Sequence, residues 1–249
     1  MKNFLVLTII LMLGAYGRVV AQDAAAASKR ANQQYVLFES ERDKGTNVTG
    51  MYSYLLDSYE NFMKVVEAPD NGQYLSGAKN RLRAMYPYLL NGAVYYSEQK
   101  QPSKALDFAA AYIEMPRLKI FQSELLPKDN RYASVVYYAA VSAYNLQKYS
   151  QALKYFQEYL STGTDTQQKD CYVYMNMIYQ SQKNYSEQER VLEEAIAKYP
   201  VSLDFLYNLV NLHIATNNMP KLLSAIDRIL EVDPNNDKVL PIKARILER

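Results

Sequence analysis

The chain has 249 residues, of which 49% are hydrophobic, so it is long enough to bury a substantial core. Its 28 basic and 26 acidic residues lack the basic surplus that nucleic-acid binding or general attraction to an anionic membrane requires. One histidine and one cysteine exclude a two-histidine metal site and an internal disulfide.

Residues 1–21 have the pattern of a cleaved secretory signal peptide. Lys2 supplies a positive charge, the run from Phe4 to Leu13 is almost entirely apolar, and Val19-Val20-Ala21 provides small residues where a signal peptidase reads. The apolar run is only about half of the roughly 20 residues of a membrane-spanning helix. We expect cleavage before Gln22 and a periplasmic or secreted protein, with an uncleaved N-terminal anchor as the alternative. No cysteine follows the run, so a lipid anchor is not expected.

Residues 22–85 form a predicted N-terminal region of two helices. The first runs from Ala24 to about Arg42 and the second from Met51 to Val66, with a polar loop between them that contains two glycines. Ala68-Pro69-Asp70-Asn71-Gly72 is a turn signal. The region is interpreted either as a degenerate version of the helix pairs that follow or as a hairpin that caps them.

A pattern of two short apolar-striped helices recurs from residue 86 to the C-terminal part of the chain. Its clearest copies lie 34 residues apart and share their residue classes: Tyr179, Tyr185, Ala195-Ile196 and Pro200, then His213, Met219, Ile229-Leu230 and Pro234. Residues at i, i+3, i+4 and i+7 share one helix face, so each copy offers a stripe that packs on the next helix. Four segments carry the pattern, at about 86–116, 134–166, 169–202 and 203–236.

This pattern resembles the tetratricopeptide repeat, TPR, in which a pair of short helices recurs every 34 residues. The resemblance implies an all-α fold: a right-handed TPR-like solenoid of antiparallel helix pairs with a C-terminal capping helix at 237–249. Pro200 is expected to end one hairpin, and Ser186-x-x-Glu189 has the form of a capping box at a helix start. Larger residues stand where the family prefers small ones, which predicts looser or rotated packing in the third and fourth repeats: Asn176, Gln188, Val210 and Leu222.

Two features lie outside the repeats. The segment Met115 to Asn130 is too apolar for a loose loop, so we expect a short helix or turn laid back on the solenoid. Lys79 and Arg83 are four residues apart on one helix face, which is compatible with binding a carboxylate or sulfate and also with an ordinary solvated face.

The residue types that carry catalysis are nearly absent. His213 falls where the repeat has a buried aromatic residue, so we expect a core histidine. Cys171 lies at a predicted helix start, and we interpret it either as a semi-buried structural thiol or as a partner in an intermolecular disulfide. No glycine-rich phosphate loop and no Gly-x-Ser-x-Gly elbow occurs. We therefore expect no enzymatic activity, no cofactor and no bound metal.

The resemblance implies that first-helix residues beside the core stripe line a concave groove. Carried onto this chain, these are Leu90, Val94, Tyr138, Ser142, Asn145, Val173, Met177, Gln180, Tyr207, Asn211 and Ile214. The set has hardly a charge, unlike the Lys/Asn/Arg clamp with which some TPR proteins hold a C-terminal carboxylate. Tyrosine and methionine are enriched in interface cores, so the set favours a protein or peptide segment as the partner.

The functional hypothesis is an exported, non-catalytic scaffold or adaptor that binds a protein or peptide in this groove. Two alternatives stay open: an accessory glycan-binding protein of the cell envelope that uses exposed tyrosines, and an outer-membrane assembly component. A third alternative is that the chain's own termini cover the groove residues.

Overall fold

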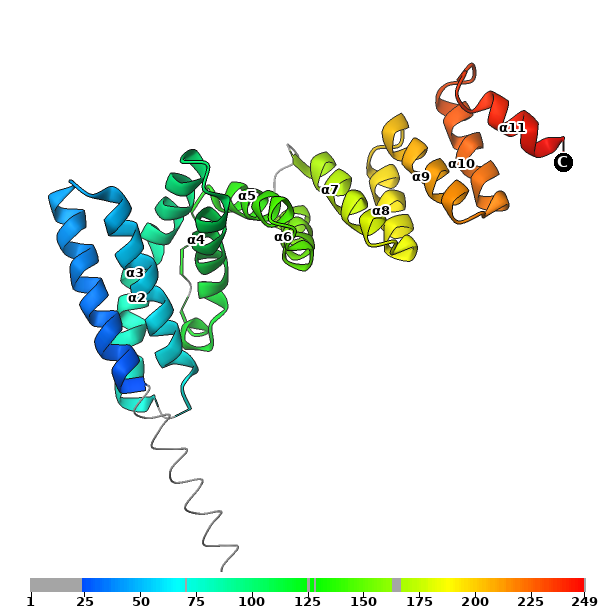
Figure 1. Ribbon diagram of the computed structural model, residues 1–249. Coiled ribbons are helices and arrows are strands. Elements are labelled where there is room, and N and C mark those ends of the chain that lie inside the picture. Colours follow the sequence, from blue (N-terminus) through cyan, green and yellow to red (C-terminus); the bar gives the residue numbers. More distant parts are fainter. Residues whose placement is uncertain (1–23, 70, 125, 128, 163–166, 249) are drawn as a thin grey trace, which may run out of the picture. The chain divides into compact units, whose positions relative to one another are not determined.

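The computed structural model describes residues 24–69, 71–124, 126–127, 129–162 and 167–248. The predicted signal peptide, residues 1–21, lies outside these ranges. Every regular element within them is helical, as expected (Figure 1). No helix in the described part of the chain combines the length and hydrophobicity that a membrane crossing requires. Contacts divide the chain into two compact units, unit 1 (Met1–Ser142) and unit 2 (Ala143–Arg249).

Unit 1 begins with a helix over residues 24–44 and continues through four further α-helices and two short 3₁₀ helices. Their bounds are α2 (Val48–Glu67), α3 (Gly72–Glu98), α4 (Pro102–Glu114), η1 (Met115–Arg117), η2 (Lys119–Phe121) and α5 (Tyr132–Asn145), whose end passes into unit 2. Asn47 caps α2, since its side-chain oxygen accepts the Gly50 N–H at 2.9 Å. Asn71 closes the next turn by donating its amide to the carbonyls of Val65 and Val66, both at 3.0 Å.

The core of unit 1 is rich in aromatic residues. Phe38, Phe62 and Phe108 are almost fully buried, and α3 packs against both α2 and α4. Gly92 is required at the α3–α4 contact, because a Cβ there would lie 2.5 Å from a ring carbon of Phe108. The helix over 24–44 is tied to α2 where the Ser58 hydroxyl donates to the Ala31 carbonyl at 2.9 Å.

The boundary expected between residues 85 and 86 falls inside α3, which runs unbroken through Pro87. The N-terminal region and the first repeat therefore share one helix of 27 residues.

The described residues of the segment 115–130 pack onto the rest of unit 1, as expected. Met115 and Phe121 lie on its 3₁₀ turns and are fully buried. Glu124 forms ion pairs with Arg83 and, at 2.7 Å, with Lys79. The two basic residues thus bind a carboxylate, but it belongs to their own chain.

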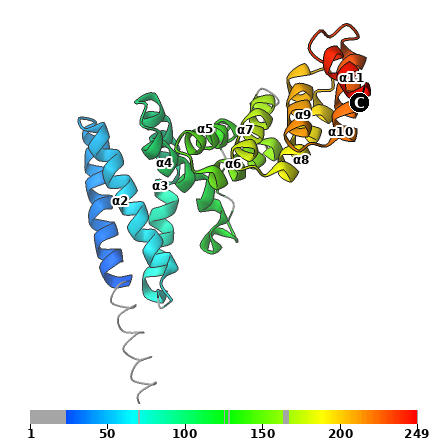
Figure 2. The ribbon, with the colours of Figure 1, turned by 45° about the vertical axis from the view of Figure 1, so that its right-hand side comes forward.

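Unit 2 is a series of helices in which each one packs on the next (Figure 2). Their bounds are α6 (Tyr149–Thr162), α7 (Gln168–Ser181), α8 (Tyr185–Lys198), α9 (Leu203–Ala215), α10 (Met219–Val232) and α11 (Leu240–Leu247). Helix α8 ends two residues before Pro200, which confirms the predicted hairpin end. Its start differs from the prediction: Asn184 caps α8 by accepting the Glu187 N–H at 3.4 Å, so the predicted capping box at Ser186 does not form the cap.

Within the predicted cap at 237–249, eight residues form α11, and none of these eight is buried, whereas Val239 just before the helix is 1% exposed. The apolar side chains of α11 therefore remain on the surface of unit 2.

The same turn recurs at the middle of the four helix pairs from α3 to α10. Four non-glycine residues adopt φ between 51° and 58°: Lys100, Gln147, Lys183 and Asn217. In the α7–α8 turn, the Asn184 N–H donates to the Tyr179 carbonyl at 2.9 Å and the Lys183 N–H donates to the Gln180 carbonyl at 3.0 Å. The other three turns have equivalent hydrogen bonds, which is the Schellman pattern of a helix C-terminus. In these four turns the left-handed position is occupied by a residue other than glycine, so the sequence gives no glycine signal for it.

Looser or rotated packing was expected where large residues replace small ones, and the burial of these residues shows no loosening. Asn176 and Gln188 are both buried, and the Gln188 side-chain amide donates to the Asn176 side-chain oxygen at 3.0 Å. Val210 and Leu222 are also buried. The third repeat therefore joins its two helices by a polar pair, and the fourth by apolar packing.

Candidate functional site

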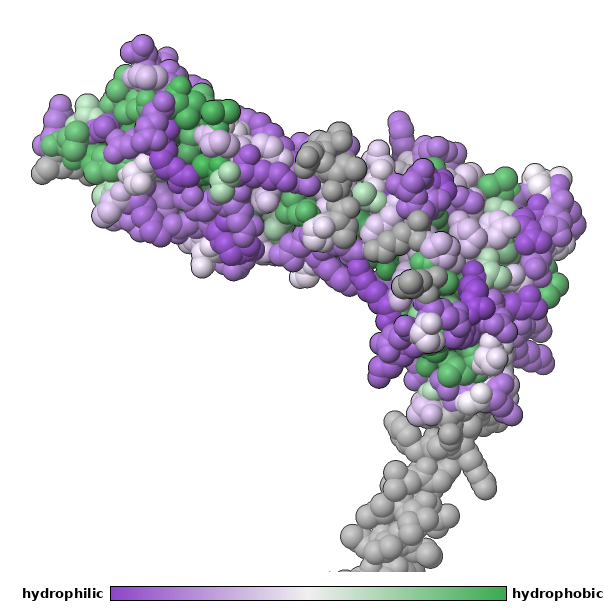
Figure 3. Space-filling view, turned by 180° about the vertical axis from the view of Figure 1, so that it is seen from behind, coloured by the Kyte–Doolittle hydropathy of each residue, from purple (hydrophilic) through white to green (hydrophobic). Residues whose placement is uncertain are grey.

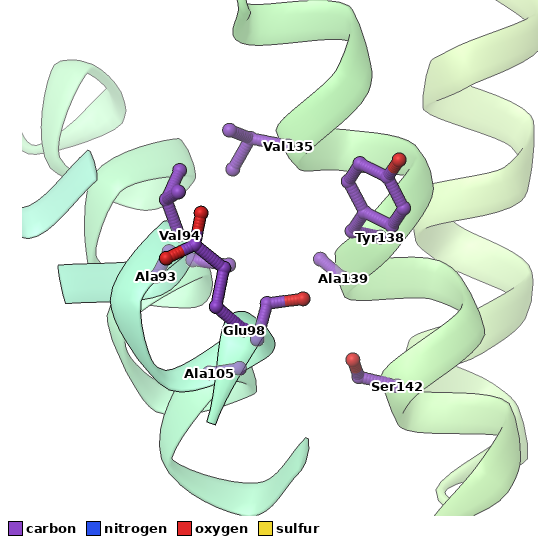
Figure 4. Close-up of a pocket in the computed structure, with 10 residues that line it drawn as sticks. Ala93, Val94, Glu98, Ala105, Val135, Tyr138, Ala139 and Ser142 are labelled. Atoms are coloured by element: carbon purple, nitrogen blue, oxygen red, sulfur yellow. The ribbon is translucent and has the colours of Figure 1, made fainter. Parts of the chain in front are cut away.

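Three predicted groove residues line one cavity of about 230 Å³ in unit 1: Val94, Tyr138 and Ser142. Helices α3 and α4 supply one wall, and α5 supplies the other (Figure 4). The structure thus brings together first-helix positions from two consecutive repeats.

The floor of this cavity consists of alanines. Ala93, Ala105, Ala109 and Ala139 are all buried and all line it. Small residues are needed where α3 and α4 approach closely, as at Gly92. Because no long side chain projects from these positions, a hollow with methyl walls remains between α4 and α5.

The rim of the cavity carries two features of different chemistry. Tyr138 is 59% exposed, so one of the largest side chains in unit 1 faces water. Glu98 lies along the α3 wall beside Val94, and no cation among the described residues pairs with it (Figure 4). An apolar hollow with a carboxylate and an exposed phenol ring at its rim suits the binding of a side chain.

Leu90 differs from the expectation. It is only 2% exposed and lines a different cavity, together with Tyr86 and Leu126. Leu126 belongs to the segment that follows α4, which has no counterpart in the other repeats. This segment lies over the part of α3 that the repeat pattern would leave open, so Leu90 presents no accessible side chain.

The predicted residues of unit 2 mostly face solvent. Val173, Met177 and Gln180 occupy one stripe of α7, and the first two are 37% and 43% exposed. Asn145, Asn211 and Ile214 are also exposed. These side chains form an apolar and amide-bearing face on successive first helices.

Tyr207 is a groove residue of unit 2 that the chain itself engages. Its hydroxyl accepts a hydrogen bond from the Asn236 side-chain amide at 2.7 Å, and the Lys238 ammonium lies 5.1 Å from its ring centroid. The loop before α11 therefore covers this part of α9. At Tyr207 the groove is thus covered by the C-terminal part of the chain, as one of the alternatives expected.

The end of unit 2 that carries the C-terminus is also apolar. Figure 3 shows hydrophobic residues gathered there. Ile214, Met219, Ile242 and Ile246 line a cavity of about 570 Å³ between α11 and the preceding helices. Ile214 therefore belongs to this terminal surface as well as to the predicted groove.

The two residues with the greatest chemical reactivity are buried. Cys171 is fully buried, not semi-buried as one prediction had it, and burial raises the pKa of its thiol to about 12. A fully buried thiol cannot reach a second chain, so an intermolecular disulfide is incompatible with this fold. His213 is 2% exposed, and burial lowers the pKa of its imidazole. Its Nδ1 has no hydrogen-bond partner among the described groups. The described residues contain no cluster of three or more histidine, cysteine or acidic side chains placed to hold a metal.

The sequence prediction missed Ser97 and Glu98, which line the unit 1 cavity. A signal for Ser97 was present, because it follows Leu90 by seven residues, as Asn145 follows Tyr138. Glu98 has no such signal, since it lies next to the groove positions and not on them.

Stacked helix pairs with one recurring turn confirm the predicted resemblance at the level of the fold. This chain has the fold of a tetratricopeptide repeat protein. No protein-family model and no curated protein sequence matches it.

Several solved structures are similar in fold, at low sequence identity. The crystal structure of the MamA protein is 12% identical, with a TM-score of 0.43, and the match covers 85% of this chain and 96% of that one. PilF of Pseudomonas aeruginosa is 12% identical, with a TM-score of 0.39 and coverage of 88% and 99%. A tetratricopeptide repeat protein from Parabacteroides merdae is 15% identical, with a TM-score of 0.34 and coverage of 82% and 80%.

Proposed function

We propose that this chain is an exported, non-catalytic scaffold that holds a protein or peptide segment against the first helices of its repeats. One observation carries the proposal: large hydrophobic side chains stay exposed at the predicted groove positions. Tyr138 is 59% exposed, Ile214 49% and Met177 43%, whereas their helix neighbours Ala139, His213 and Ile178 are buried. Exposed apolar side chains on the same face of successive first helices favour a binding surface over chance exposure.

Export rests on the sequence pattern of residues 1–21 and is part of the proposal. Cleavage before Gln22 would leave every helix described above intact.

The distribution of tyrosines favours a peptide partner over a glycan. A sugar platform needs aromatic faces open to solvent. Among the tyrosines in the described ranges, only Tyr138 and Tyr185 are exposed, and Tyr185 lies at the start of a second helix. Of the other described tyrosines, ten are buried in the core, as Tyr96 and Tyr112 are, and eleven are only partly exposed.

Site-specific photo-crosslinking in cells that make the protein tests this function. A photoreactive residue replaces Ser97 inside the unit 1 cavity, and a matched probe replaces Glu60, which is exposed on α2. We expect the Ser97 probe to capture a defined polypeptide segment that the Glu60 probe does not capture. Ser142→Arg, which fills the cavity mouth from the opposite wall, should abolish that capture. If both probes capture the same neighbours, or if Ser142→Arg leaves the capture unchanged, the groove assignment fails.

A further inference from the structure

We propose that the unit 1 cavity receives a lysine or arginine side chain of the bound partner. This inference rests on the proposed function and deepens it, because it names the chemistry that the groove selects. The wall residues that carry it are Glu98 and Tyr138, above the alanine floor.

The floor suits the stem of a long basic side chain. Ala93, Ala105, Ala109 and Ala139 present methyl groups and no polar atom of their side chains. Lysine and arginine bury their methylene stems along apolar surface while their charged heads remain in a polar setting. A hollow of about 230 Å³ is large enough to accept such a stem from outside.

The charge at the rim selects the head group. Glu98 is the only ionisable acid or base among the lining residues, Tyr138 aside. The acidic residues Glu124 and Asp129 of the same unit are already paired, with Lys79 and Arg131. Glu98 has no such partner in the described chain, so the cavity offers an uncompensated negative charge beside an apolar floor, where Coulombic attraction is stronger than in bulk water.

Tyr138 supplies a second attraction for a cation. Its ring stands on the α5 wall, across the hollow from Glu98 (Figure 4). Aromatic faces attract ammonium and guanidinium groups through the ring quadrupole. The chain uses this contact internally, since Arg81 lies 4.2 Å from the ring centroid of Tyr35 and Lys104 lies 5.0 Å from that of Tyr96. A partner cation between Glu98 and Tyr138 would meet a carboxylate on one side and a ring on the other.

Fluorescence anisotropy with labelled nonapeptide libraries tests the inference on the full chain. The libraries have uncharged random flanks and a fixed central arginine, lysine, norleucine or glutamate. Norleucine has the stem of lysine without the cation, so it isolates the charge. We expect the arginine and lysine libraries to bind about 5- to 10-fold more tightly than the norleucine library, and the glutamate library to bind most weakly.

Two variants and one control locate the effect. Glu98→Gln should reduce the advantage of the basic libraries to about twofold or less, and Tyr138→Leu should reduce it by a smaller factor. Glu60→Gln removes an exposed carboxylate of the same unit and should leave the preference unchanged.

The outcomes separate this inference from the proposed function. If norleucine peptides bind as tightly as arginine peptides and the Ser142→Arg variant binds neither, the groove binds peptides but the inferred preference for a basic side chain is wrong. A basic preference that survives Glu98→Gln also overturns the inference. Failure of the proposed function is seen separately, as crosslinking from Ser97 that does not depend on the cavity.

Discussion

Removing one member of the buried Asn176–Gln188 pair should destabilise unit 2, whereas removing both should not. The Gln188 amide donates to Asn176 at 3.0 Å, and the two residues are only 2% and 3% exposed, so water cannot replace a lost partner. Asn176→Leu strands the glutamine amide and Gln188→Met strands the asparagine oxygen. An unsatisfied buried polar group costs about 1–3 kcal/mol.

The double variant Asn176→Leu/Gln188→Met replaces both polar groups with apolar groups of similar shape. Such a replacement is close to neutral, so the cost of the double variant should fall below the sum of the two single-variant costs by roughly 2–6 kcal/mol. The four proteins are compared by urea denaturation followed by far-UV circular dichroism. With a slope of about 2–3 kcal/mol per M, a loss of about 2 kcal/mol lowers the midpoint by about 0.7–1 M.

Gln180→Met serves as the matched control, because Gln180 is an exposed glutamine on the same helix, and its effect should stay within about 0.5 kcal/mol. Additive single-variant costs, or single variants as stable as wild type, would refute the idea that this polar pair holds α7 against α8.

Three further predictions concern the buried thiol, the buried imidazole and the recurring turn. The Cys171 thiol, with its pKa raised to about 12 by burial, should react with a disulfide reagent at least about 100-fold more slowly in native protein than in urea-unfolded protein; a native rate equal to the unfolded one would show that α7 opens. Burial lowers the pKa of His213 below its ordinary 6.5, so protonation favours the unfolded chain and stability should fall as pH drops below about 6.5. His213→Phe should flatten that part of the stability–pH curve, and an unchanged slope would place the proton uptake elsewhere. Lys183 has φ of 54°, so Lys183→Gly should be neutral or stabilising, whereas Lys183→Val should cost about 1–2 kcal/mol; equal thermal midpoints for the two variants would argue against a strained turn.

The helix pairs were predictable because their signals are local. Apolar spacing in the sequence located α8 and α10, and Pro200 and Pro234 follow their ends as expected. The start of α8 was less predictable. Asn184 and Ser186 are both good caps, and the choice depends on the left-handed Lys183 just before them, which no glycine announces.

The buried face of α5 was predicted one residue out of phase. The repeat pattern places Tyr137, Ala140, Val141 and Tyr144 on the buried stripe of this helix. Ala140 is buried, whereas the other three are partly exposed and Val136 and Ala143 are fully buried instead. At the start of this helix Tyr132 is buried and its ring lies 6.2 Å from that of Tyr112 on α4. This long-range contact follows an insertion that the repeat pattern does not contain, so periodicity alone does not set the rotation of the helix.

The candidate site was predicted only in part, for the same reason. Tyr138 and Ser142 follow from repeat position, and the structure places both at the cavity. Leu90 is buried and shares a cavity with Leu126 of the inserted segment, which the repeat pattern does not include. The role of Glu98 depends on its lack of a partner, which is a property of the folded chain.

The accessibility of a cysteine placed in the unit 1 cavity tests the central claim most directly. Cys171 is buried, so Ser142→Cys provides the one accessible thiol among the described residues, and Glu60→Cys provides the matched control on α2. Alkylation is timed in cells that make the protein and again on purified protein. A scaffold with an occupied groove predicts that the cysteine at 142 reacts several-fold more slowly in cells than when purified, relative to the cysteine at 60. Equal protection of the two positions would contradict the account, because the cavity would then hold no partner.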